Sequence, residues 1–106
     1  MSGLLARYYS PDYFTARSRF RTAADRAGFE LSATAISARG PGGEPLHVDF
    51  ARKGAANPRT VVVVSSGTHG IEGFFGSAVQ LRALEKMIAR RKLAAHTAVV
   101  MVHAVN

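Results

Sequence analysis

The sequence predicts an α/β fold, a partial mixed β-sheet with flanking helices, and three observations support this prediction. An amphipathic helical pattern covers residues 11–27, and two strand-like segments flank a glycine-rich turn at residues 39–43. A strand, a helix and a second strand then follow one another over residues 60–103. This succession is typical of parallel strands joined by a crossover helix.

The first helix is expected at residues 11–27. Small and aromatic residues recur there at three- and four-residue steps, and arginines occupy most of the remaining arc. Pro11 suits the first helical position, Ser10 can cap the helix, and Gly28 can end it. We therefore expect an amphipathic helix.

Residues 30–37 and 46–52 are expected to be strands. Both are rich in β-branched or alternating apolar residues, and the turn between them contains three glycines and a proline. They should pair as an antiparallel hairpin. In the second strand, Leu46, Val48 and Phe50 alternate with His47, Asp49 and Ala51.

Residues 60–65 and 97–103 are expected to be strands of a different kind. Each contains consecutive apolar residues without alternation, which is typical of a parallel strand buried on both faces. The first should lie in the centre of the sheet. A helix is predicted between them at residues 74–91, with one apolar face that consists of Phe74, Ala78, Leu81, Leu84 and Ile88.

The composition limits the classes of protein to which the chain can belong. Its 106 residues suffice for one domain at most, or for part of one. Because it contains no cysteine, disulfide frameworks, thiol nucleophiles and cysteine-based zinc sites are excluded. No apolar run approaches the roughly 20 residues of a membrane-spanning helix, and the N-terminus lacks the pattern of a secretory signal. We therefore expect a cytoplasmic protein.

The formal net charge of +7 invites a nucleic-acid interpretation. However, the basic residues are spread through every segment, and the one tight cluster, Arg90, Arg91 and Lys92, ends the helix predicted at residues 74–91. No aromatic residues are interleaved with this cluster to stack on bases. We expect a solvated basic surface, with neither nucleic acid nor a membrane as a partner.

His69 and Glu72 are the candidate metal ligands. They lie three residues apart in a glycine-rich turn that follows the strand predicted at residues 60–65. In open parallel sheets, ligands bind beyond the carboxyl ends of the strands, and imidazole and carboxylate are common zinc donors. The residues expected to form the turn or support the ligands are Gly67, Gly70, Gly73, Ser65, Ser66 and Thr68.

Two other interpretations of this turn remain open. The glycines loosely match a dinucleotide-binding fingerprint, but their first spacing is wrong, and Glu72 would put a negative charge where a pyrophosphate sits. Alternatively, the chain is a small non-catalytic α/β module whose glycine-rich turn is purely structural. The spacing of the histidine and the glutamate does not by itself decide between these interpretations and a metal site.

A family resemblance favours the metal. Residues 61–74, together with residues 9–13 and 102–106, resemble the zinc carboxypeptidase and aspartoacylase-like superfamily, in particular a bacterial branch of it classified as a domain of unknown function. The resemblance implies that His69 and Glu72 are two of three zinc ligands. It also implies hydrolysis of an amide bond through a metal-bound water, in a peptide or small-molecule substrate that carries a carboxylate.

The resemblance leaves the site incomplete in this chain. The family's third ligand, its catalytic glutamate and its substrate-binding arginines have no matching position here. We therefore assign no catalytic residue and expect the chain to be inactive as it stands. His103 and Asn106 match the family's His-Ala-x-Asn stretch, and we expect His103 to be a packing or supporting residue. His47 and His96 are expected at the surface.

The domain organisation follows from the same observations. The strand predicted at residues 97–103 requires protein on both faces, and the remaining residues offer little to cover it. We therefore expect residues 1–106 to be the N-terminal portion of a single metallohydrolase-like domain that is apparently truncated. Its exposed apolar surface should cause self-association or poor solubility.

Overall fold

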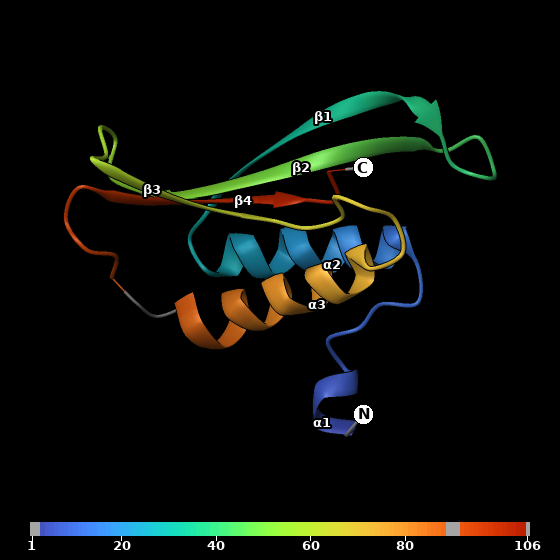
Figure 1. Ribbon diagram of the computed structural model, residues 1–106, viewed down its shortest axis with the longest axis horizontal. Coiled ribbons are helices and arrows are strands. Elements are labelled where there is room, and N and C mark those ends of the chain that lie inside the picture. Colours follow the sequence, from blue (N-terminus) through green and yellow to red (C-terminus); the bar gives the residue numbers. More distant parts are fainter. Residues whose placement is uncertain (1–2, 89–91, 106) are drawn as a thin grey trace.

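The computed structural model describes residues 3–88 and 92–105, and it has the predicted mixed α/β architecture (Figure 1). The four strands form one sheet in the order β1-β2-β4-β3, in which only β3 and β4 are parallel. Helices α2 and α3 lie side by side on the same face of this sheet (Figure 1). The elements are, in chain order, α1 (Gly3–Ala6), α2 (Tyr13–Arg26), β1 (Glu30–Arg39), β2 (Pro45–Gly54), β3 (Thr60–Ser65), α3 (Gly73–Arg82), the π-helical segment η1 (Ala83–Ile88) and β4 (Thr97–His103).

Helix α2 begins two residues later than predicted, and its cap is different. The side chain of Asp12 accepts a hydrogen bond from the Thr15 amide at 2.8 Å, so Asp12 and not Ser10 caps the helix. The hydroxyl of Ser10 instead accepts a bond from Arg19. At the other end, Gly28 adopts a φ of +83°, as expected of a glycine that follows a helix.

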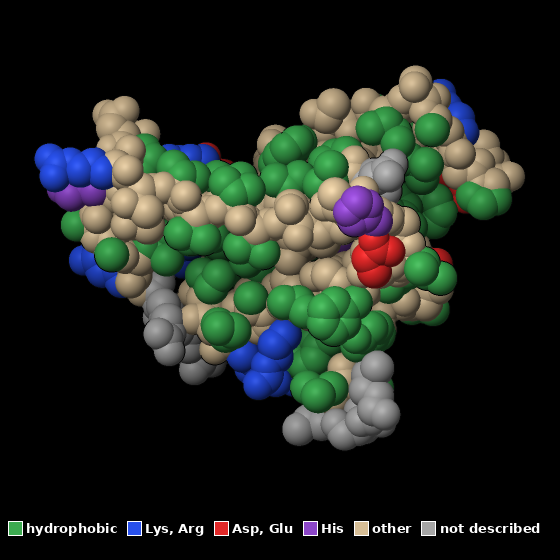
Figure 2. All heavy atoms as spheres, in the orientation of Figure 1, with side chains coloured by type: hydrophobic (Ala, Val, Ile, Leu, Met, Phe, Trp, Pro, Cys, Tyr) green, Lys and Arg blue, Asp and Glu red, His purple; other side chains and the backbone are tan. Residues whose placement is uncertain are grey.

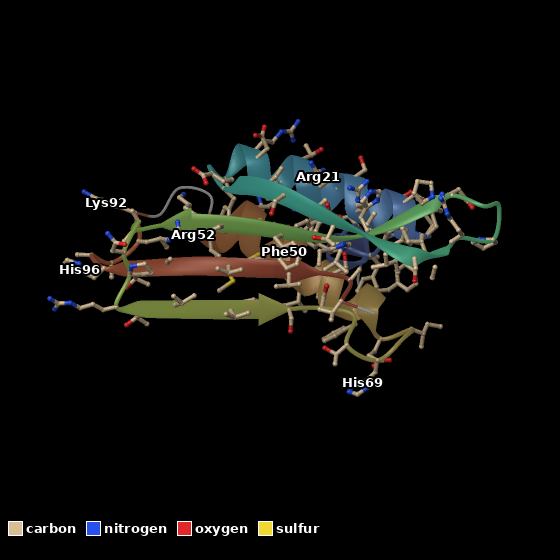
Figure 3. All side chains as sticks on the ribbon, turned by 90° about the horizontal axis from the view of Figure 1, so that it is seen from above. Arg21, Phe50, Arg52, His69, Lys92 and His96 are labelled. Atoms are coloured by element: carbon tan, nitrogen blue, oxygen red, sulfur yellow. The ribbon has the colours of Figure 1, made fainter. Side chains whose placement is uncertain are left out.

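The β1–β2 hairpin is confirmed, but the buried face of β2 is not the one that its apolar residues suggest. Asp49 and Ala51 are fully buried beneath the helices. Phe50 and Arg52 point from the opposite, uncovered face of the sheet (Figure 3). A buried aspartate needs compensating partners, and α2 provides them, as shown below.

Strand β3 has the predicted bounds and the predicted parallel partner, but its predicted central position is wrong. It is an edge strand, and among the described strands it pairs with β4 alone. Val61, Val62 and Val63 are 49%, 46% and 62% exposed. The four consecutive valines therefore indicate a strand that could be buried on both faces. Among the described residues, only Val64 of the four packs against the core.

Strand β4 is a central strand, but the predicted burial on both faces holds only in part, because Val100 and Val102 on the face opposite the helices are half-buried. It lies between β2 and β3, and Ala98, Val99, Met101 and His103 are buried. With Phe20 and the buried alanines of α2, and with Leu81 and Leu84 of α3 and η1, it forms the hydrophobic core between the sheet and the helices.

The helix predicted at residues 74–91 begins at Gly73 and becomes π-helical at Ala83. On its predicted apolar face, Ala78, Leu81 and Leu84 are buried, and Phe74 and Ile88 are half-buried. Arg90 and Arg91, expected in its last turns, lie outside the described residues. None of the helices described is long and apolar enough to span a lipid bilayer.

Candidate functional site

The two candidate metal ligands lie on the loop that joins β3 to α3, at the carboxyl end of β3. His69 and Glu72 are both exposed. His69 points away from the sheet at the outer side of the loop (Figure 3). Glu72 directly precedes the first residue of α3, and its side chain makes no capping hydrogen bond. Both side chains are thus open to a ligand from solvent.

The glycines of this loop are required by its backbone. Gly67 and Gly70 have φ values of +74° and +87°, which disfavour any residue with a Cβ. A Cβ on Gly67 would also lie 2.9 Å from the Cα of Ala104. The loop closes with a bond from the Gly73 amide to the Gly70 carbonyl at 2.9 Å. The turn that carries His69 and Glu72 is therefore tightly defined by local geometry.

Ser66 joins this loop to the end of β4. Its side chain is buried, and its hydroxyl accepts a bond from the Ala104 amide at 3.1 Å. Its own amide donates to the Val102 carbonyl, and its carbonyl accepts from the Val105 amide. Ser66 thus supports the loop through the backbone, whereas Ser65 and Thr68 are exposed.

His103 lies in the core rather than beside His69. Its side chain is 1% exposed, stacks on Phe20 at 4.7 Å between ring centres, and places Nε2 2.8 Å from the Ser77 hydroxyl. Burial lowers the pKa of the imidazole to about 4. The Asp49 carboxylate opposes this lowering, and the Arg17 guanidinium adds to it. His103 is therefore a neutral packing residue at neutral pH, as expected.

A cluster of charged side chains next to His103 was not predicted from the sequence. Asp49 is fully buried and accepts bonds from Arg17 Nε at 2.7 Å and from Arg21 Nη1 at 2.7 Å. Asp49 in turn raises the pKa of Arg17. The available signal was the spacing of the two arginines by one helical turn on α2, together with a lone aspartate in a strand.

The other two histidines do not join His69 and Glu72 in a group of potential ligands among the described residues. His47 is half-buried, and its backbone amide and carbonyl both bond the Tyr13 hydroxyl, at 2.9 and 2.7 Å. His96 is exposed in the turn before β4, at the opposite end of the sheet from His69 (Figure 3). Neither is placed to complete a metal site with His69 and Glu72.

A pocket of about 150 Å³ adjoins the loop on its helix side. Its lining is mostly apolar, with Ser77 and His103 among its polar members. The remaining lining residues are Tyr13, Ala16, Gly67, Gly70, Gly73, Phe74 and Ala104. Small groups that bind beside the loop would contact this apolar surface.

His69 and Glu72 are residue types that bind zinc, but two protein ligands are fewer than a catalytic zinc site uses. An imidazole and a carboxylate are ordinary zinc donors, and both are accessible here. Among residues 3–88 and 92–105, however, no group of three or more potential ligands converges on one point. The described residues can therefore supply two of the three protein ligands of a catalytic zinc site.

Residues 9–106 match a protein family described as "Protein of unknown function (DUF2817)". None of the curated proteins matches the chain.

Two solved structures share the fold. The glutaminyl cyclase of Fimbriiglobus ruber is similar over 94% of this chain, with a TM-score of 0.61 and 10% identity. A putative zinc-dependent exopeptidase from Bacteroides vulgatus is similar over 94% of the chain, with a TM-score of 0.56 and 12% identity. The chain spans 41% and 42% of the lengths of these two structures. It thus has the fold of part of a zinc-exopeptidase-like protein.

Proposed function

Because the chain belongs to the DUF2817 family and has a zinc-exopeptidase-like fold, we propose that it contributes two zinc ligands to a hydrolase that cleaves amide bonds. The supporting observation is the position of His69 and Glu72. Both are exposed on one tightly defined glycine loop at the carboxyl end of a parallel strand, where ligands bind in such sheets.

In this proposal His69 and Glu72 hold the ion, and the rest of the loop positions them. When bound, zinc activates water as a nucleophile and polarises the carbonyl group that is attacked. Ser66 and the positive-φ Gly67 define the backbone that leads to His69, and the positive-φ Gly70 lies between the two ligands. Our proposal assigns no proton-transferring residue to this chain.

The substrate belongs to the same proposal. We propose an amide substrate, either a peptide or a small molecule, that carries a carboxylate. The apolar pocket beside the loop would contact a small apolar group of such a substrate. The reaction would take place in the cytoplasm.

Zinc binding tests the proposal directly. We expect the chain to bind Zn²⁺ weakly in isothermal titration calorimetry, because it supplies two protein ligands rather than three. His69→Ala and Glu72→Gln should each weaken binding roughly tenfold or more. His96→Ala provides the matched control, since His96 is exposed at the other end of the sheet.

Two results would favour the alternative, a small non-catalytic α/β module with a structural turn. One is an absence of zinc binding by the wild-type chain. The other is binding that His69→Ala and Glu72→Gln leave unchanged while His96→Ala abolishes it.

A further inference from the structure

The side chain of Gln80 connects α3 to the two parallel strands. It is 1% exposed, and its Nε2 donates to the Val64 carbonyl at 2.9 Å and to the Val102 carbonyl at 3.0 Å. Val64 and Val102 are each the second-last residue of their strands, β3 and β4. One amide group therefore joins the helix to both strand ends that border the loop of His69 and Glu72.

This connection determines the distance between the two ends of the loop. The loop leaves β3 after Ser65, one residue beyond Val64, and it ends at Gly73, two helical turns before Gln80. The backbone at the two ends of the loop is also closely packed, which leaves little room for the loop to move. A Cβ on Gly73 would lie 3.0 Å from the Cα of Gly67.

The amide of Gln80 is not explained by stability alone. Its Oε1 is buried and has no hydrogen-bond partner among the described residues. An unsatisfied buried acceptor is unfavourable, and an apolar side chain of similar length would avoid this cost. Compared with such an apolar side chain, glutamine adds the two donated hydrogen bonds to the strand carbonyls.

We infer that Gln80 is a positioning residue for the metal-binding loop. By joining α3 to the ends of β3 and β4, it holds the backbone that carries His69 and the helix start that carries Glu72 at one separation. A loop held in this way loses less conformational entropy when the two side chains bind one ion. The inference about the ion depends on the proposed function, whereas the inference about loop order does not.

Gln80→Met tests the inference, because methionine keeps the length of the side chain and removes both donated bonds. In the metal-free chain, we expect the amides of Ser66, Gly73 and Val105 to exchange hydrogen at least tenfold faster, by NMR, than in the wild type. Amides in the middle of α2 should change much less. Zinc affinity should fall several-fold.

Leu84→Met is the matched control. Leu84 is fully buried one turn further along the same helical segment and contributes no side-chain hydrogen bond. The Leu84→Met variant should change the hydrogen-exchange rates of loop amides and of α2 amides to the same degree. Gln80→Asn, whose amide is one methylene too short to reach both carbonyls, serves if Gln80→Met does not fold.

The outcomes separate this inference from the proposed function. Selective loss of loop protection supports the positioning role even if the wild-type chain binds no zinc, in which case only the proposed function fails. If loop and α2 amides accelerate equally in the Gln80 variants, the inference is wrong. It is equally wrong if zinc binds and its affinity is unchanged in a variant with a more mobile loop.

Discussion

At the scale of single residues, the interior of this small domain contains more polar chemistry than its composition suggests. Asp49, Gln80 and His103 are all nearly or fully buried. Asp49 and His103 of the sheet bond side chains of the helices, whereas Gln80 of α3 bonds carbonyls of two strands. Buried polar groups are tolerated when they are hydrogen-bonded, and they then specify one packing arrangement. Here they determine how α2 and α3 dock on the sheet.

His103 should make the stability of the chain depend on pH. Its pKa is about 4 in the folded state and about 6.5 when unfolded, so the unfolded chain binds the proton more readily. The contribution of the neutral imidazole is complete above pH 6.5 and is lost as the pH falls from 6.5 to 4. We expect the free energy of unfolding to decrease by about 3 kcal/mol over this range from His103 alone.

Urea unfolding at pH 7 and at pH 4.5 measures this effect. His103→Asn should remove most of the difference between the two pH values, because the substituted side chain does not titrate. His96→Asn is the control, since His96 is exposed and the substitution should leave the difference intact. An equal pH dependence in the wild type and in His103→Asn would contradict the prediction.

At the scale of elements, one buried carboxylate holds α2 on the sheet. Asp49 of β2 accepts three bonds, two from Arg17 and one from Arg21, which lie one turn apart on the helix. Both arginines keep part of their side chains in solvent, with 27% and 36% exposure. The arginines can be hydrated when unpaired, whereas Asp49 cannot, so the cluster matters chiefly because it satisfies Asp49.

The double variant Arg17→Met with Arg21→Met leaves this carboxylate buried and unpaired. We expect it to lose about 3–5 kcal/mol of stability in urea unfolding at pH 7. Adding Asp49→Leu should recover most of that loss, because an apolar side chain needs no partner in the core. A double variant as stable as the wild type, or a triple variant no more stable than the double one, would refute this account.

At the scale of the whole molecule, the described helices that pack on the sheet all lie on one of its faces (Figure 1). On the opposite face the register groups apolar residues of three adjacent strands, namely Val61, Val63, Val100, Val102 and Phe50. The edge strand β3 also leaves hydrogen-bonding groups unpaired and contains no charge or proline that would block pairing. Hydrophobic side chains gather along β3 and over α3 in Figure 2.

We therefore predict that this chain self-associates in solution. Val63, the most exposed valine of β3 at 62%, is the position to test. Val63→Lys should shift the chain from oligomer to monomer in sedimentation velocity at equal concentration, because a charged edge disfavours strand pairing. Thr34→Lys, which adds the same charge to an exposed position of the other edge strand, should not. A wild-type chain that is monomeric at every concentration would disprove the prediction.

Most features that depend on residues close together in the sequence were predicted correctly, whereas several features that depend on contacts between distant segments were not. The bounds of β3 and β4 were predicted to the residue, because runs of valine and methionine determine strand formation locally. The termination of α2 shortly before Gly28 and the position of His69 and Glu72 beyond β3 were also predicted, from glycine chemistry and from the geometry of parallel strands. Whether the pair binds zinc stays a prediction.

By itself, the sequence determined the α/β class, the order of the elements and the place of the candidate ligands, because each follows from residues adjacent in the chain. Only the tertiary structure decided that β3 lies at an edge, that Asp49 is buried, and that Gln80 reaches two strands. These features depend on which segments pair across long stretches of sequence. A local pattern such as four consecutive valines indicates that a strand can be buried, but the segments that would cover it are distant in the sequence.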